Sequence, residues 1–245
     1  MLKRSTLAVL AAALLSAPHF APAQPPARSE AKPATVTPAD RNGESWWKQR
    51  HEHVLEENVK GEAELLFIGD SITQGWEDAG KQAWASHFEP RRAANLGFSG
   101  DRTQHVLWRL DHGEVDGFKP KAAVIMIGTN NSSGSDNTAD EIAGGIKAIV
   151  ARLREKQPQL HILLLGVFPR GEKPNPQREK LAAVNAAIAK LDDGKMVHYL
   201  DIGPKFMQPD GTITKEIMPD YLHLSAKGYD IWAEAIDAKV AELMK

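Results

Sequence analysis

Four short polar segments of this sequence carry side chains that could do chemistry. Ser71 brings a hydroxyl, Asn130 an amide, Asp220 and His223 a carboxylate beside an imidazole, and residues 97–100 form a glycine-rich turn. A serine hydroxyl becomes a nucleophile only when a neighbouring base takes its proton, and histidine is the side chain most often used for this. These residue types fit nucleophilic chemistry, provided that the fold brings the segments together.

Each segment also has an ordinary structural explanation. Ser71 follows an apolar run and could cap the next helical turn. Gly100 could supply a positive φ in a tight turn, and Asn130 could be a left-handed turn residue. Asp220 and His223 could form a simple loop hydrogen bond. Chemistry is favoured because all four segments occur in one chain, in loops that a single sheet would gather at one edge.

Five short apolar runs predict the strands of that sheet, at residues 64–68, 92–96, 122–127, 161–167 and 196–200. The third and fourth runs are continuously apolar, which is typical of strands covered on both faces in a parallel sheet. Helical patterns lie between the runs. Thr138 and Glu141 predict a capping box at the start of one helix. Asp193-Gly194 predicts the end of the next helix, and Ser225 predicts the cap of the last helix.

Alternating strands and helices predict one α/β domain, a three-layer α/β/α sandwich around a five-stranded, mainly parallel sheet. Ligands of such sheets bind beyond the carboxyl ends of the strands, where these polar segments would lie. Ahead of the domain (residues 43–245), residues 24–42 are rich in Pro and Ala and predict a flexible linker. Residues 1–23, with two basic residues, an apolar run and Ala21-Pro22-Ala23, predict a signal peptide and an exported protein.

Composition excludes several other classes of function. Without Lys3 and Arg4, 28 basic residues face 32 acidic ones, a net charge of −4 with no basic block, so no nucleic-acid partner is expected. No apolar stretch is long enough for a stable membrane anchor. The segment His51-Glu-His-Val-Leu55 lacks the second histidine of H-E-x-x-H, and the chain has no cysteine, so no metal is assigned. No phosphate-binding glycine motif occurs, and no cofactor is expected.

Six tryptophans could stack on sugar rings, but most fit the core better. Trp232 lies on the apolar stripe of the last helix, and Trp108 lies in a helical pattern with Val106 and Leu110. Trp76 differs, because it lies five residues after Ser71 in a polar segment. We therefore expect Trp76 to line the acyl or alcohol pocket.

The segments GDSIT, NLGFSGD, GTNN and DYLH stand in the order of the four sequence blocks of the SGNH (GDSL-type) hydrolases, which this chain resembles. Further stretches, TQHVLWRLDHGEV and GVFPRGEKPNPQREK among them, are similar to the catalytic subunits of the intracellular platelet-activating-factor acetylhydrolases. The similarity runs from about Trp46 to Lys245. It implies a flavodoxin-like SGNH hydrolase fold.

The resemblance also implies a role for each block. Ser71 would be the nucleophile, His223 the base and Asp220 the acid that orients the imidazole. The oxyanion hole would consist of the backbone N–H groups of Ser71 and Gly100 and the amide of Asn130. Leu222, within the last block, would contact substrate together with Trp76. Ser99 departs from the acetylhydrolase subunits, which have glycine there, and this puts the choice of substrate in question.

The sequence therefore predicts an exported serine esterase that hydrolyses short-chain esters, acetyl above all, through an acyl-serine intermediate. Export favours a glycan ester such as an acetylated carbohydrate, whereas the resemblance favours a phospholipid acetyl ester; other small-molecule esters stay open. A module that binds acylated ligands without turning them over is an alternative of another class. The resembling subunits form dimers, so a homodimer is an open expectation here.

Overall fold

The computed structural model describes residues 32–41, 43–61 and 63–245, with the backbone alone at 58–61. Five parallel strands form one sheet in this part of the chain, in the order β2-β1-β3-β4-β5. The strands are β1 (Leu65–Gly69), β2 (Ala93–Gly97), β3 (Ala122–Met126), β4 (His161–Leu165) and β5 (Val197–Leu200). They confirm the five predicted runs within two residues at each end. The central strands β1 and β3 are buried along their whole length, as their continuous apolar sequences require.

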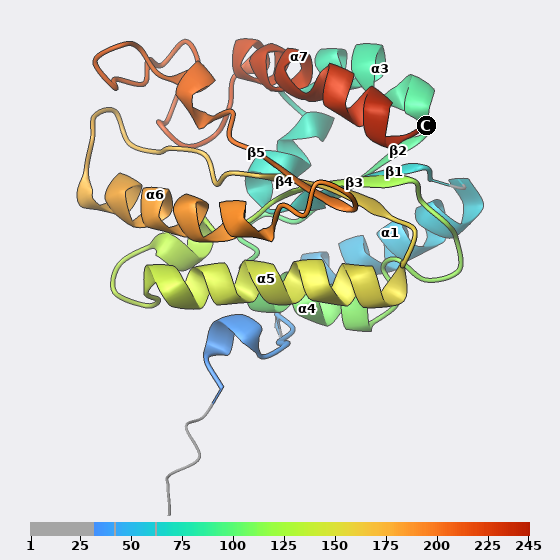
Figure 1. Ribbon diagram of the computed structural model, residues 1–245. Coiled ribbons are helices and arrows are strands. Elements are labelled where there is room, and N and C mark those ends of the chain that lie inside the picture. Colours follow the sequence, from blue (N-terminus) through green and yellow to red (C-terminus); the bar gives the residue numbers. More distant parts are fainter. Residues whose placement is uncertain (1–31, 42, 62) are drawn as a thin grey trace, which may run out of the picture. The chain divides into compact units, whose positions relative to one another are not determined.

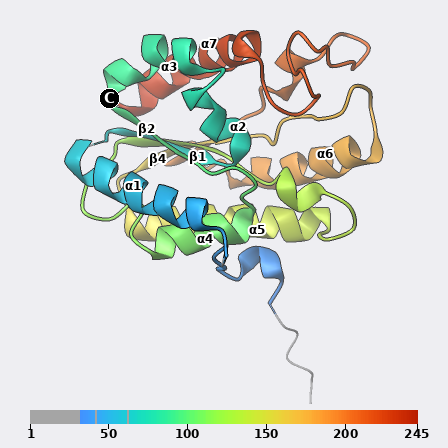
Figure 2. The ribbon, with the colours of Figure 1, turned by 180° about the vertical axis from the view of Figure 1, so that it is seen from behind.

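Helices cover both faces of the sheet, which confirms the predicted three-layer α/β/α sandwich. Helices α3 and α7 lie on one face, and α1, α4, α5 and α6 lie on the other (Figures 1 and 2). The helices are α1 (Ser45–Gly61), α2 (Ser71–Gln74), α3 (Lys81–His87), α4 (Thr103–Asp111), α5 (Ala139–Lys156), α6 (Pro176–Ile188) and α7 (Ala226–Leu243). Short 3₁₀ turns are η1 (Ala34–Val36), η2 (Gly75–Glu77), η3 (Glu89–Arg91), η4 (Asn130–Ser132), η5 (Ala189–Leu191) and η6 (Gly203–Phe206).

The helix caps follow the sequence pattern with one exception. Thr138 and Glu141 form the capping box of α5, and the Ser225 hydroxyl accepts a hydrogen bond from the N–H of Gly228 at the start of α7. Helix α6, in contrast, ends at Ile188 rather than at Asp193-Gly194, because η5 tightens the chain before that turn. None of the described helices is both long enough and apolar enough to cross a membrane.

The predicted flexible linker, residues 24–42, is wrong for residues 32–41. This part packs against α4 and α5 with Thr35 fully buried. The Thr103 hydroxyl donates to the carbonyl of Thr35 at 2.9 Å, and the N–H of Ala39 donates to the carbonyl of Gln104 at 3.1 Å. Proline-rich composition does not reveal such packing, because the partners lie far along the chain. The predicted signal peptide and residues 24–31 lie outside the described residues.

Candidate active site

Ser71 lies at the carboxyl end of β1, where it begins α2 rather than capping it. The N-cap is Asp70, whose Oδ1 accepts a hydrogen bond from the N–H of Ile72 at 3.0 Å. The Ser71 hydroxyl oxygen instead lies 2.9 Å from Nε2 of His223, a residue of the loop before α7. Its side chain is therefore engaged with an imidazole, and the helix-cap explanation of Ser71 is wrong.

Asp220 holds His223 from the other side of the ring. Its Oδ2 lies 2.6 Å from His223 Nδ1, while its Oδ1 accepts hydrogen bonds from the backbone N–H groups of Leu222 (3.0 Å) and His223 (2.7 Å). Partial burial opposes ionisation of Asp220, but these hydrogen bonds outweigh it and the pKa of the carboxyl is lowered. An ionised Asp220 keeps the proton on Nδ1, which leaves Nε2 able to accept the proton of Ser71.

A left-handed residue closes the loop that carries this pair. Tyr221 has φ +61°, a conformation that costs an ordinary residue about 1–2 kcal/mol. Its carbonyl accepts a hydrogen bond from the N–H of Gly171 at 2.7 Å. The turn places the Asp220 carboxylate beside the His223 imidazole only three residues later.

Gly100 and Asn130, the other predicted participants, lie in the loops after β2 and β3. Gly100 has φ +76°, which favours glycine. Asn130 Nδ2 donates to the carbonyl of Asp101 at 2.9 Å, and the second N–H of that amide has no partner among the described residues. The Asp101 bond fixes the direction of the amide, so its second N–H can serve a ligand.

Ser71 and His223 line a cavity of about 300 Å³. Besides these two residues, its walls consist of Gln74, Gly75, Asp78, Ala79, Ser99, Leu224 and Tyr229. Sequence reasoning missed Gln74, although a residue three positions after Ser71 shares its helix face. The Gln74 side-chain oxygen accepts a hydrogen bond from the N–H of Ser99 at 2.8 Å, which links α2 to the glycine-rich turn.

Two predicted pocket residues do not line this cavity. Trp76 is buried in an aromatic cluster with Tyr229 and Trp232, at ring-centroid distances of 4.6 and 4.9 Å. The η2 turn directs the Trp76 side chain into the core. The polar residues around Trp76 in the sequence did not indicate this direction. Leu222 is half-buried and packs against the core, and Leu224 takes the place in the cavity wall.

Asp70 is adjacent to Ser71 in sequence but does not contact His223 through any hydrogen bond of the described residues. Its carboxyl is fully buried, and burial raises its pKa to about 7, against the lowering effect of the Ile72 N–H. Arg170 lies near enough to interact electrostatically with both Asp70 and Asp220, and its guanidinium donates to the Thr129 hydroxyl at 3.2 Å. Asp70 is thus a buried structural acid, whereas Asp220 is the acid on the imidazole.

The two histidines of the 51–55 segment, His51 and His53, differ in their surroundings. His51 is buried against Trp47 and Trp108, and burial lowers its pKa to about 4, whereas His53 is exposed. Among the described residues, no group of three His, Cys, Asp or Glu side chains could hold a metal ion.

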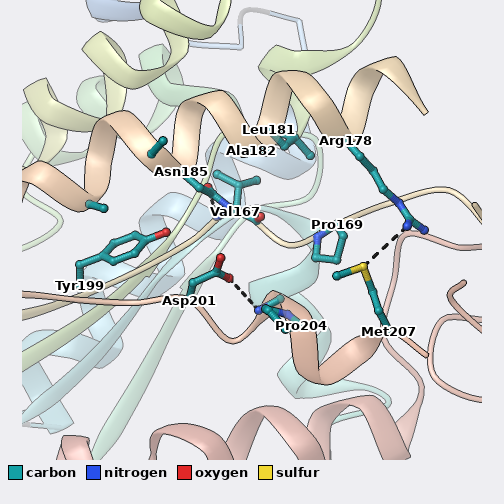
Figure 3. A pocket seen from close by; sticks show the side chains of 13 residues that line it. Val167, Pro169, Arg178, Leu181, Ala182, Asn185, Tyr199, Asp201, Pro204 and Met207 are labelled. Carbon is teal, nitrogen blue, oxygen red and sulfur yellow. Dashed lines mark hydrogen bonds between the residues drawn. The ribbon is translucent and has the colours of Figure 1, made fainter. Parts of the chain in front are cut away.

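A second cavity, of about 450 Å³, lies between α6 and the ends of β4 and β5 (Figure 3). Its lining includes Tyr199 and Asp201, and Asn185 is held by the backbone N–H and carbonyl of Val167 at 2.8 and 3.0 Å. This cavity is larger but contains none of the serine, histidine and glycine residues considered above. The smaller cavity is therefore the one that holds the candidate catalytic residues Ser71 and His223.

A parallel sheet with a hydroxyl, an imidazole and a carboxylate at its carboxyl edge defines a hydrolase of the serine type. The sequence of residues 67–231 matches the GDSL-like lipase/acylhydrolase family. The chain is 41% identical over 214 residues to platelet-activating factor acetylhydrolase IB subunit alpha1 of Bos taurus, covering 87% of this chain and 89% of that protein. This chain belongs to the GDSL-like lipase/acylhydrolase family and is a carboxylic ester hydrolase.

Solved structures share the fold at lower identity. A GDSL-like lipase from Bacteroides thetaiotaomicron superposes with a TM-score of 0.65 at 22% identity, covering 80% of this chain and 97% of that one. Est24, a carbohydrate acetylesterase from Sinorhizobium meliloti, superposes with a TM-score of 0.59 at 22% identity, covering 74% and 98%. These similarities confirm the fold class.

Proposed function

We propose that this chain is an exported serine esterase that removes short acyl groups, acetyl above all, with Ser71 as nucleophile. The observation that carries the proposal is the continuous hydrogen-bonded chain from Ser71 through His223 to Asp220, at 2.9 and 2.6 Å. A protein that only binds acylated ligands has no need for a base beside a hydroxyl.

The geometry supports a two-step mechanism. His223 takes the proton of Ser71 as the hydroxyl oxygen attacks the ester carbonyl, and the resulting imidazolium is stabilised by Asp220. The imidazolium then protonates the leaving alkoxide. Water, deprotonated by His223 in turn, hydrolyses the acyl-serine and releases the acid.

We assign three donors to the oxyanion of the tetrahedral intermediates. The N–H of Ser71 belongs to the first turn of α2, whose N–H groups lack partners within the helix. The N–H of Gly100 and the amide of Asn130 complete the set. Donors fixed before the reaction stabilise the developing charge without reorganisation, and each contributes roughly 10²–10³ in kcat.

For the substrate, we propose an acetyl ester of a carbohydrate. Support comes from the export signal expected in residues 1–23, from the polar side chains Gln74, Asp78 and Ser99 in the cavity wall, and from the structural similarity to a carbohydrate acetylesterase. The second candidate is a 2-acetyl phospholipid, which the 41% identity to platelet-activating factor acetylhydrolase subunits favours.

The test is acetate release from an acetylated polysaccharide and from a 2-acetyl phospholipid, each with wild type and Ser71→Ala. We expect release from the polysaccharide that the substitution abolishes. Release from the phospholipid alone would replace the proposed substrate and keep the chemistry. Release that is equal in wild type and Ser71→Ala would contradict the proposed nucleophile.

Export is tested separately, by fractionating cells that produce the full chain and sequencing the N-terminus of the product. We expect a product that begins near Gln24 outside the cytoplasm. An intact Met1 on a cytoplasmic product would contradict this part of the proposal.

A further inference from the structure

The segment in front of the domain reaches the candidate oxyanion hole through one side chain. We call residues 33–41 the N-terminal strap and residues 97–101 the oxyanion loop. At the end of the strap, Arg41 Nη1 donates to the carbonyl of Ser99 and lies 3.5 Å from Asp101 Oδ1. Its Nε and Nη2 donate to the Glu44 carboxylate at 3.0 and 2.6 Å. The guanidinium is thus held by a two-point ion pair and aimed into the loop.

The Ser99 carbonyl shares a peptide unit with the N–H of Gly100. In a trans peptide the C=O and the N–H point in opposite directions, and no described peptide bond is cis. A donor fixed on the Ser99 carbonyl therefore fixes the direction of the Gly100 N–H. A cationic donor also polarises the peptide and strengthens its N–H as a hydrogen-bond donor.

Gly100 makes this control necessary. With no side chain and φ +76°, the residue has wide backbone freedom, and packing of its own cannot restrain it. The guanidinium of Arg41 lies against it, at 3.1–3.4 Å from the position that a Cβ would take. Arg41 therefore occupies the side of the loop where the glycine leaves space.

The next residue connects the same loop to the second donor. The Asp101 carboxylate accepts hydrogen bonds from Trp47 Nε1 at 2.7 Å and from Arg109 Nε at 2.9 Å, and its carbonyl holds the Asn130 amide. Arg41 adds a second guanidinium contact to this carboxylate, after that of Arg109. The Gly100 N–H therefore belongs to the peptide unit whose carbonyl Arg41 binds, and the Asn130 amide is bound to the backbone of Asp101, whose carboxylate Arg41 contacts.

We propose that Arg41 is a positioning residue for ester hydrolysis, and that the N-terminal strap, through Arg41, orients the donors of the oxyanion hole. The inference rests on the proposed roles of Gly100 and Asn130. It makes a segment outside the sequence blocks of the family a determinant of transition-state stabilisation in this chain.

The test is the substitution Arg41→Met, which keeps the aliphatic stem and removes the guanidinium. Arg50→Met is the matched comparison, because Arg50 also pairs with a glutamate, Glu77, and donates to a carbonyl of the same loop, that of Gly97, at 2.8 Å. The peptide unit after Gly97 carries none of the three proposed donors. Steady-state kinetics on an acetyl ester, with Tm as a fold control, separates the two.

We expect kcat to fall about tenfold in Arg41→Met, part of the 10²–10³ that a whole donor contributes, with KM changed less than about twofold. The fold-decrease in kcat of Arg50→Met should be at most a third of that of Arg41→Met. Arg41→Lys should recover part of the loss, because lysine restores the positive charge without the two-point pairing. An unchanged kcat in Arg41→Met, or equal losses in Arg41→Met and Arg50→Met, would overturn the inference. Activity that survives in wild type and disappears in Ser71→Ala keeps the proposed function in either case.

Discussion

Two loops border the cavity around Ser71, and they are held in opposite ways. The loop of Asp220 and His223 is partly exposed and is shaped mainly by bonds within itself, from the Asp220 carboxylate to two backbone N–H groups. The oxyanion loop is fixed from behind by buried side chains of α1 and α4. Its Asp101 pairs with Arg109, which is itself buried between Asp101 and Glu114 and stacks on Phe98 at 3.9 Å.

The difference follows from what each loop must do. The imidazole exchanges protons with substrate and water, so it has to be reachable, and a local carboxylate suffices to orient it. Oxyanion donors are useful only when their direction is set before charge develops. A buried ionic cluster resists reorientation, because breaking one of its pairs leaves a charge in a medium that solvates it poorly.

The largest effect is expected on the exposed side, from Asp220→Asn. The amide would turn an N–H toward His223 Nδ1 and favour the tautomer with its proton on Nε2, which cannot accept from Ser71. We expect kcat to fall about 10³–10⁴-fold, while the urea midpoint stays close to that of wild type. A drop below tenfold in a folded variant would remove Asp220 from the mechanism.

Arg109→Met tests how much the buried ionic cluster behind the oxyanion loop contributes to the stability of the fold. The change takes the guanidinium away from two buried carboxylates, so the free energy of unfolding should fall by about 3–5 kcal/mol in urea denaturation. Arg152→Met is the control, because its ion pair with Asp111 is partly exposed and should contribute about 1 kcal/mol or less. Equal losses in the two variants would contradict the contrast between the loops.

Asn130→Ala removes one donor and leaves the oxyanion loop in place. We expect kcat to fall roughly 10²–10³-fold with little change in KM, since the amide acts on the transition state. Steady-state kinetics at saturating ester measures this. A folded variant with near-normal kcat would exclude the amide from the oxyanion hole.

The smallest effect concerns Asp70. Its pKa is raised to about 7 in the folded chain, from an ordinary 3.8, so the folded state binds the proton more tightly and loses stability as pH rises between these values. Asp70→Asn keeps an acceptor for the Ile72 N–H without the charge. It should be more stable than wild type at pH 8, on the order of 2 kcal/mol, and the gap should shrink at pH 5. A gap independent of pH would show that Asp70 does not titrate in this range.

The sequence alone predicted the strands and most helices, because apolar runs and capping residues act locally. It also singled out Ser71, Gly100, Asn130, Asp220 and His223, since polar residues at strand ends must meet at one edge of a parallel sheet. It could not place Trp76, whose direction depends on the η2 turn, or the N-terminal strap, whose partners lie on α4 and α5. It also left open whether Ser71 is a helix cap or a nucleophile, because a serine that follows a strand can do either.

The most direct test of the account is covalent labelling of the mature chain by a fluorophosphonate, with the modified residue mapped by mass spectrometry. We predict one phosphonylated residue, Ser71, and no labelling of Ser71→Ala. Ser99→Ala, which removes the other serine hydroxyl in the cavity wall, should still be labelled. An unlabelled wild type, or a label on Ser99, would contradict the assignment of Ser71 as the nucleophile of this esterase.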